Sequence, residues 1–136
     1  MKFSDLESAF EYVSAGGPGM NYAFIERDTG VIHWHSEYGD NEHELPEDIA
    51  DDRYLQIPHK KDLDLGKPLA LRFAELHLPE QYSQVREIFS RSGAYARFKD
   101  LLEHDGKLNA WYTFEEQEFH AALRNWCLEN GIDVED

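Results

Sequence analysis

The strand-like pattern in this chain is confined to residues 21–57, and helical periodicity fills most of the rest. The segments 21–27 and 31–36 are rich in β-branched and aromatic residues, and the short connection that ends at Gly30 predicts a β-hairpin. Residues 54–57 predict a third short strand. Strands in one part of a chain and helices in another are typical of an α+β fold. We therefore expect an α+β fold with a small antiparallel sheet of about three strands.

Apolar residues at helical spacing predict one helix before the strands and several after them. The first is expected over residues 5–15, where Ser4 and Glu7 have the spacing of a capping box. In the C-terminal half we expect helices over residues 65–77, from Pro79 onward, from about Tyr95 to Asp105, and from Thr113 to Asn130.

Capping signals mark the expected ends of two C-terminal helices. Asp62 or Asp64 is expected to cap the helix over residues 65–77 and to complement its dipole. Thr113 and Glu116 form a second capping box.

Cys127 is the only cysteine, and it lies on the apolar stripe of the last predicted helix. Gly131 takes the position that follows a helix C-terminus, and Ile132 is spaced to contact Cys127 in a Schellman closure. A buried thiol reacts poorly, so a catalytic nucleophile is not expected.

One cysteine excludes an internal disulfide, and no signal peptide or apolar membrane span is recognisable. We expect a cytoplasmic protein.

The chain has 136 residues and 41% hydrophobic content, which suffices for a core. It shows no internal repeat and no low-complexity linker. We expect a single domain over residues 1–136, with the N-terminal helix and hairpin in residues 1–57 and a helical part in residues 62–132. The N-terminal helix is expected to pack on the sheet face that carries Trp34.

The chain is strongly acidic, with 13 Lys and Arg against 28 Asp and Glu and a net charge of −15. This charge argues against direct binding to nucleic acid, and it is compatible with a basic protein partner, with cation binding or with solubility alone. Residues 37–52 contain eight acidic residues and no Lys or Arg. They are expected to form an acidic surface loop with one helical turn near residues 46–50, either functional or only solubilising.

His33 and His35 alternate along a predicted strand, so both face away from Ile32 and Trp34. Together with His43 and an acid of the loop they have the ligand types of a metal site. Exposed hairpin histidines are the alternative. The loop lacks the EF-hand pattern, and no cofactor is predicted.

Asp62 and Asp64 lie between the third predicted strand and a predicted helix, a junction suited to a site. With His33 and His35 they form a candidate metal or polar site, whose function would be that of a small metal-assisted hydrolytic enzyme. Helix capping explains the two carboxylates equally well. Neither G-x-S-x-G nor H-E-x-x-H is present, so no catalytic residue is assigned.

Positive charge is scarce, and much of it lies in or near the segment 92–102, in Arg86, Arg91, Arg97, Lys99 and Lys107. Arg97 and Lys99 project away from the apolar stripe there, and aromatic and arginine residues are enriched in binding hot spots. The alternative is that both pair with Asp100 and Glu103. The candidate interaction surface consists of Tyr95, Arg97, Lys99, Asp100, Trp111 and Tyr112, although the sequence does not say whether Trp111 is buried.

Three stretches, DLDLGKPLALRFAELHLPE, SGAYARFKDLL and WCLENGI, together resemble a family of small acidic bacterial proteins that is classed only as uncharacterised. The order and spacing are similar from about residue 45 to residue 132. The resemblance implies one complete domain in a cytoplasmic bacterial protein. It carries no catalytic residue over to this chain.

The absence of catalytic motifs and the polarised charge favour a non-enzymatic module that binds a protein partner, and a basic partner is the sharper form of this hypothesis. The expected binding surface is either the segment 92–102 or the acidic loop of residues 37–52. Self-association into a homo-oligomer is a further hypothesis, and no membrane partner is expected.

Overall fold

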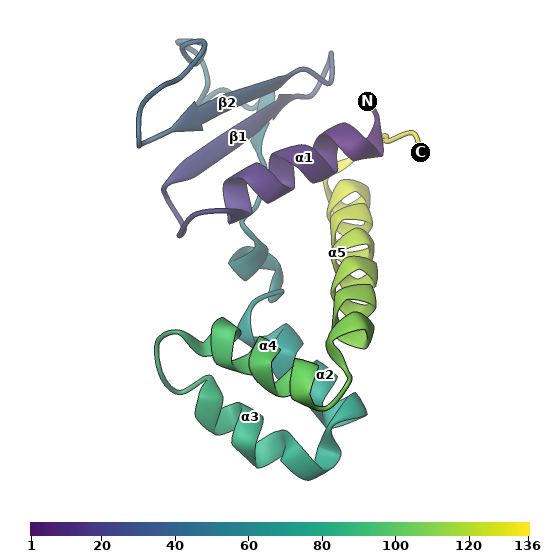
Figure 1. Ribbon diagram of the computed structural model, residues 1–136. Helices are drawn as coiled ribbons and strands as arrows, with labels where there is room; N and C mark the ends of the chain where they lie inside the picture. Colours follow the sequence, from purple (N-terminus) through teal and green to yellow (C-terminus); the bar gives the residue numbers. More distant parts are fainter. The chain divides into compact units, whose positions relative to one another are not determined.

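The computed structural model describes residues 1–136 and confirms the α+β fold, with an N-terminal helix, a three-stranded sheet and a helical C-terminal half (Figure 1). None of the helices is both long and apolar enough to cross a membrane. In chain order the elements are α1 (Phe3–Ser14), β1 (Asn21–Glu26), β2 (Ile32–Ser36), β3 (Tyr54–Gln56), the 3-10 helix η1 (Lys60–Leu63), α2 (Lys67–His77), the 3-10 helix η2 (Pro79–Gln81), α3 (Tyr82–Ile88), α4 (Ala94–His104) and α5 (Leu108–Asn130).

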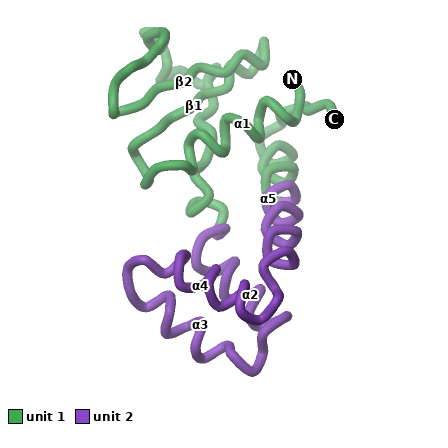
Figure 2. The backbone as a smooth tube through the Cα atoms, viewed as in Figure 1, with its two compact units in different colours: residues 1–63, 122–136 green, residues 64–121 purple.

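The chain divides into two compact units (Figure 2). Unit 1 comprises residues 1–63 and 122–136, and it holds α1, the sheet, η1 and the C-terminal end of α5. Unit 2 comprises residues 64–121, with α2, α3, α4 and the N-terminal part of α5. The sequence predicts a single domain, and the division into two compact units does not test that prediction.

The sheet of unit 1 has the strand order β2-β1-β3, and both strand pairs are antiparallel. In the predicted hairpin Ala23 pairs with Trp34, and Ile25 pairs with Ile32. β1 is therefore the central strand, and β2 and β3 each have one edge that no other strand covers.

Helix α1 packs on one face of this sheet, as Figure 1 shows. Tyr12 of α1 meets Trp34 of β2 edge to face, with 5.1 Å between the ring centroids. The prediction that the N-terminal helix covers the Trp34 face is therefore confirmed. The buried side chains of this layer are Phe3, Leu6, Ala9, Phe10 and Val13 of α1 with Ala23 and Ile25 of β1.

The capping box predicted for α1 is wrong. The helix begins at Phe3 without a side-chain cap, and Ser4 lies inside it, where its carbonyl accepts a hydrogen bond from Ser8 Oγ (3.0 Å). The C-terminal tail holds this end of the helix instead. The Phe3 N–H donates to the Glu135 carbonyl (2.7 Å), and the Glu135 N–H donates to the Met1 carbonyl (2.9 Å). A partner distant in sequence thus replaces the local cap.

Neither Asp62 nor Asp64 caps α2, which begins at Lys67 without a side-chain cap. Asp62 Oδ2 accepts a hydrogen bond from the His59 N–H (2.9 Å), and the Asp62 N–H donates to the His59 carbonyl (2.9 Å). The side-chain bond caps η1 rather than α2, and the backbone bond belongs to the first turn of this 3-10 helix. Asp64 has a φ of 56°, so it turns the chain in the left-handed region before α2 begins.

The capping box predicted at Thr113 is also wrong, because α5 already begins at Leu108. Gly106, with a φ of 69°, reverses the chain after α4, and the backbone N–H of Trp111 donates to the Lys107 carbonyl (3.0 Å). Trp111 is buried in unit 2. The first turns of α5 therefore contain the buried Trp111 side chain, and the helix begins before the predicted cap.

The C-terminal end of α5 is formed as predicted. Gly131 has a φ of 67°, the Ile132 N–H donates to the Cys127 carbonyl (2.9 Å), and the Gly131 N–H donates to the Leu128 carbonyl (3.4 Å). These two bonds are those of a Schellman motif.

Replacing Gly131 with alanine is therefore expected to lower the free energy of unfolding by about 1 kcal/mol, because a Cβ disfavours the left-handed conformation. Gly17→Ala is the matched control. A Cβ added at either glycine has no heavy atom within 4 Å, and only Gly131 has a positive φ. Urea denaturation followed by circular dichroism measures both variants. Equal stabilities would contradict the conformational cause.

Candidate functional site

A cavity of about 250 Å³ lies in unit 1 beside β2. It is lined by Ile32, His33 and Trp34 of β2, by Tyr12 of α1, and by residues 40–44 of the acidic loop. We call this cavity the β2 groove. Two features that the sequence suggested separately, the acidic loop and the strand with Trp34, therefore lie together.

The aromatic part of the β2 groove comes from Trp34 and Tyr12. Trp34 remains 41% exposed although α1 lies on the same face of the sheet. Large aromatic side chains contribute much of the binding energy at interfaces, so a half-open tryptophan in a groove is suited to ligand contact.

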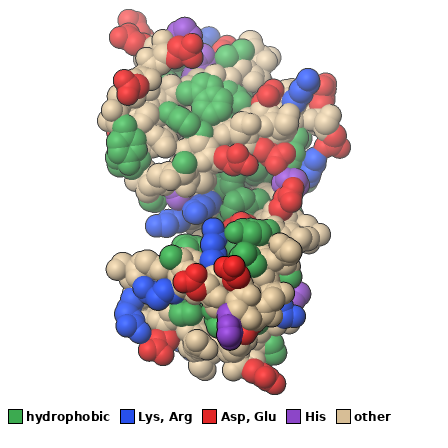
Figure 3. Space-filling view, in the orientation of Figure 1, with side chains coloured by type: hydrophobic (Ala, Val, Ile, Leu, Met, Phe, Trp, Pro, Cys, Tyr) green, Lys and Arg blue, Asp and Glu red, His purple; other side chains and the backbone are tan.

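The acidic part of the β2 groove consists of Asp40, Glu42 and Glu44, none of which forms an ion pair in the structure. Elsewhere in the loop, Asp48 pairs with Arg53. Figure 3 shows acidic side chains close to exposed hydrophobic ones on the visible face of unit 1. Unpaired like charges in a recess raise the local negative potential, so the β2 groove favours a cationic ligand.

The loop is held against β2 by Asn41. Gly39 and Asp40 have φ angles of 92° and 58°, and these left-handed residues reverse the chain after the strand. The side-chain amide of Asn41 then donates to the Ser36 carbonyl (3.1 Å) and accepts the Ser36 N–H (2.7 Å). The acidic residues next to Asn41 are thereby held close to the C-terminal end of β2.

His33 and His35 lie on the sheet face opposite Trp34, as predicted. His33 Nε2 is 3.7 Å from Glu26 Oε2, and His35 Nε2 is 3.4 Å from Glu37 Oε1, so each imidazole has its own carboxylate. No group of three or more His, Cys, Asp or Glu side chains is placed to hold a metal ion. The structure therefore does not bring these histidines and the loop acids together as the ligands of one metal ion.

The same finding applies to Asp62 and Asp64, which form no such group with the histidines. Asp62 is engaged with the His59 N–H, and Asp64 shapes the turn before α2.

Cys127 is buried, and burial raises the pKa of its thiol, while the Arg124 guanidinium acts in the opposite direction. A raised pKa leaves little thiolate at neutral pH, so Cys127 is a poor nucleophile.

The interaction surface expected around residues 92–102 is reduced by the position of Trp111. This side chain is 1% exposed and belongs to the core of unit 2, so it cannot contact a partner. Tyr95 and Tyr112 are 37% and 44% exposed. Burial, with the Glu115 carboxylate as a second cause, raises the pKa of the Tyr95 hydroxyl.

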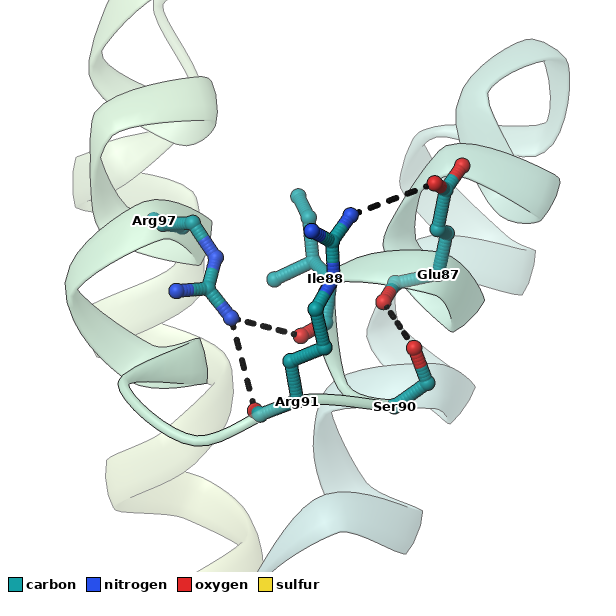
Figure 4. A network of polar contacts seen from close by, with 5 residues as sticks. All are labelled: Glu87, Ile88, Ser90, Arg91 and Arg97. Atoms are coloured by element: carbon teal, nitrogen blue, oxygen red, sulfur yellow. Dashed lines mark hydrogen bonds and ion pairs between the residues drawn. The ribbon is translucent and has the colours of Figure 1, made fainter.

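Arg97 has a structural role in unit 2 (Figure 4). Its Nη2 donates to the carbonyls of Ile88 (3.2 Å) and Arg91 (3.4 Å), so it binds carbonyl groups at the C-terminal end of α3 and in the turn that follows. The Arg91 guanidinium pairs with Glu87 (3.3 Å), and Ser90 Oγ donates to the Glu87 carbonyl (2.5 Å). Arg97 is therefore engaged within the unit.

Lys99 lies with its Nζ 5.7 Å from the centroid of the Tyr112 ring, a cation–π contact. Neither Lys99 nor Arg97 forms an ion pair with Asp100 or Glu103. The alternative of intrahelical ion pairs is wrong, because the two cations have carbonyl and aromatic partners from neighbouring segments.

Sequence reasoning missed Asn41, whose role depends on a turn that brings it back to Ser36. The sequence signal for the β2 groove is the tryptophan of β2 followed by a loop without Lys or Arg.

Comparisons of the chain with protein-family models, with curated proteins and with solved structures found no match.

Proposed function

We propose that this protein is a non-enzymatic interaction module whose β2 groove binds a basic segment of a partner protein. The observation that carries the proposal is the lining of one groove by three unpaired carboxylates and an exposed tryptophan. A cationic side chain relieves the repulsion among the carboxylates, and the indole ring offers apolar and cation–π contact.

Of the two surfaces expected from the sequence, the acidic loop is the better supported. In the surface around residues 92–102, Trp111 is buried in the core and Arg97 donates to backbone carbonyls. The alternative of a metal-assisted hydrolase has no converging group of ligands to support it. Membership of the uncharacterised bacterial family stays a prediction, and it adds no substrate to the proposal.

A lysine decapeptide is the simplest probe of this function. We expect it to bind with a Kd on the order of 10–100 μM, as small interfaces do. Binding should weaken as salt rises, because charges at the surface are screened beyond about 8 Å at physiological ionic strength. Titration of the 15N-labelled protein by NMR should shift the amide signals of residues 32–44. No shift at millimolar peptide would contradict the proposal.

Neutralising the groove with Asp40→Asn, Glu42→Gln and Glu44→Gln together is expected to weaken this binding at least about tenfold. Asparagine is chosen at position 40 because it tolerates the left-handed conformation found there. An equal loss in a matched control would mean that net charge alone drives binding. The control neutralises three carboxylates of unit 2 that form no ion pair, with Glu80→Gln, Glu103→Gln and Glu116→Gln.

A further inference from the structure

The backbone of β2 has outward-facing hydrogen-bonding groups along its free edge. The Glu26 N–H donates to the Val31 carbonyl (2.9 Å), and the Glu37 N–H donates to the Met20 carbonyl (2.8 Å), at the two ends of the β1–β2 ladder. Bonded and non-bonded residue pairs alternate along an antiparallel ladder. The odd-numbered residues of β2 therefore bond to β1, and the residues that turn their N–H and C=O groups outward are Ile32, Trp34 and Ser36.

Asn41 shows how such outward groups are satisfied. Its side-chain amide makes with Ser36 the two hydrogen bonds that a residue of a neighbouring strand would make. The outward groups of Ile32 and Trp34, next along the same edge, have no partner in the chain. An uncovered strand edge of this kind is a template for pairing with another segment.

We propose that the partner segment enters the β2 groove as an added β-strand, an extended peptide of alternating apolar and basic residues whose backbone pairs with Ile32 and Trp34. This inference rests on the proposed function and specifies the conformation of the bound segment. Successive side chains of an added strand face opposite sides of the sheet. Those on the Trp34 side meet its ring and Tyr12, and basic side chains reach the acidic part of the groove.

Charge determines which strand fits this edge. A second copy of this chain would bring a second acidic loop against the first, and like charges protect strand edges from self-pairing. A strand that carries Lys or Arg instead meets Asp40, Glu42 and Glu44. Because Asn41 already occupies Ser36, only the groups of Ile32 and Trp34 remain, so the added strand is short and its binding reversible.

Amide hydrogen exchange, measured by NMR, tests the edge directly. In the free protein we expect the Ile32 and Trp34 amides to exchange at least about tenfold faster than those of His33 and His35, which bond to β1. The probe is the acetylated and amidated hexapeptide with three Val-Lys repeats. Saturation with this peptide should slow exchange at Ile32 and Trp34 at least about tenfold, and unchanged exchange in the bound state would overturn strand addition.

Two N-methylated versions of the hexapeptide, one modified on the three valines and one on the three lysines, provide the second test. Only the alternate amides of an added strand face β2, so one version should bind at least about tenfold more weakly while the other keeps its affinity. Equal affinities of the two versions, whether retained or lost, would overturn the proposal.

These outcomes separate the inference from the function on which it rests. If the lysine decapeptide binds at the groove but the two N-methylated peptides behave alike, strand addition is wrong and the acidic interaction module stands. If no basic peptide binds, both are wrong. The remaining possible occupant of the edge is a second copy of this chain, and light scattering tests for it. A concentration-dependent dimer whose Ile32 and Trp34 amides are protected from exchange without peptide would assign the edge to that second copy.

Discussion

Replacing Trp111 with alanine is expected to lower the free energy of unfolding by about 3–5 kcal/mol, the usual cost of removing a large buried aromatic ring. Trp111 is 1% exposed, and its ring meets Phe73 and Phe98 edge to face at centroid distances of 5.3 Å and 5.1 Å. Phe114 lies 6.3 Å away. One substitution thus removes contacts to α2, α4 and α5. Urea denaturation measures the loss, and hydrogen exchange should localise it to residues 64–121.

Two further variants test whether burial is the cause. Trp111→Phe keeps an aromatic ring and removes an indole N–H that has no hydrogen-bond partner, so its cost should be less than half that of alanine. Tyr112→Ala changes the neighbouring residue, which is 44% exposed and contacts Lys99. We expect a loss of no more than about 1 kcal/mol there. A Tyr112 variant as unstable as the Trp111 variant would contradict this packing.

Replacing His59 with alanine is expected to cost about 3 kcal/mol, because two backbone groups lose their partner in a poorly hydrated site. His59 is 5% exposed. Its Nδ1 accepts the Lys61 N–H (3.0 Å), and its Nε2 lies 2.8 Å from the Gly16 carbonyl. Since Nδ1 accepts, Nε2 carries the proton and donates to Gly16. The imidazole therefore links the segment after α1 to the start of η1, and urea denaturation measures its contribution.

His43→Ala is the control for this prediction. His43 is an exposed residue of the acidic loop with no hydrogen bond or ion pair in the structure, so its removal should change the free energy of unfolding by less than about 0.5 kcal/mol. Similar losses in the two variants would show that His59 is not the buried link described above.

The β2 groove could be predicted from the sequence only in part. The acidic loop follows from eight acidic residues without a cation, and the strand position of Trp34 follows from the hairpin pattern. The sequence does not show that Asn41 returns to Ser36, because that contact depends on the left-handed turn at Asp40. The candidate metal ligands were grouped by residue type, and the structure does not bring them together. In the predicted interaction surface the structure keeps Lys99 beside Tyr112 but buries Trp111 in the core.

The sequence by itself determined the elements whose cause is local. Alternation placed Trp34 opposite His33 and His35, helical spacing placed the stripe of α1, and Gly131 ended α5, because these features depend on residues within a few positions of one another. Only the tertiary structure decided where α1 and α5 begin, that Trp111 is buried and that one edge of β2 is open. Those outcomes depend on contacts between distant segments, whose packing and pairing energies exceed the roughly 1 kcal/mol of a local cap.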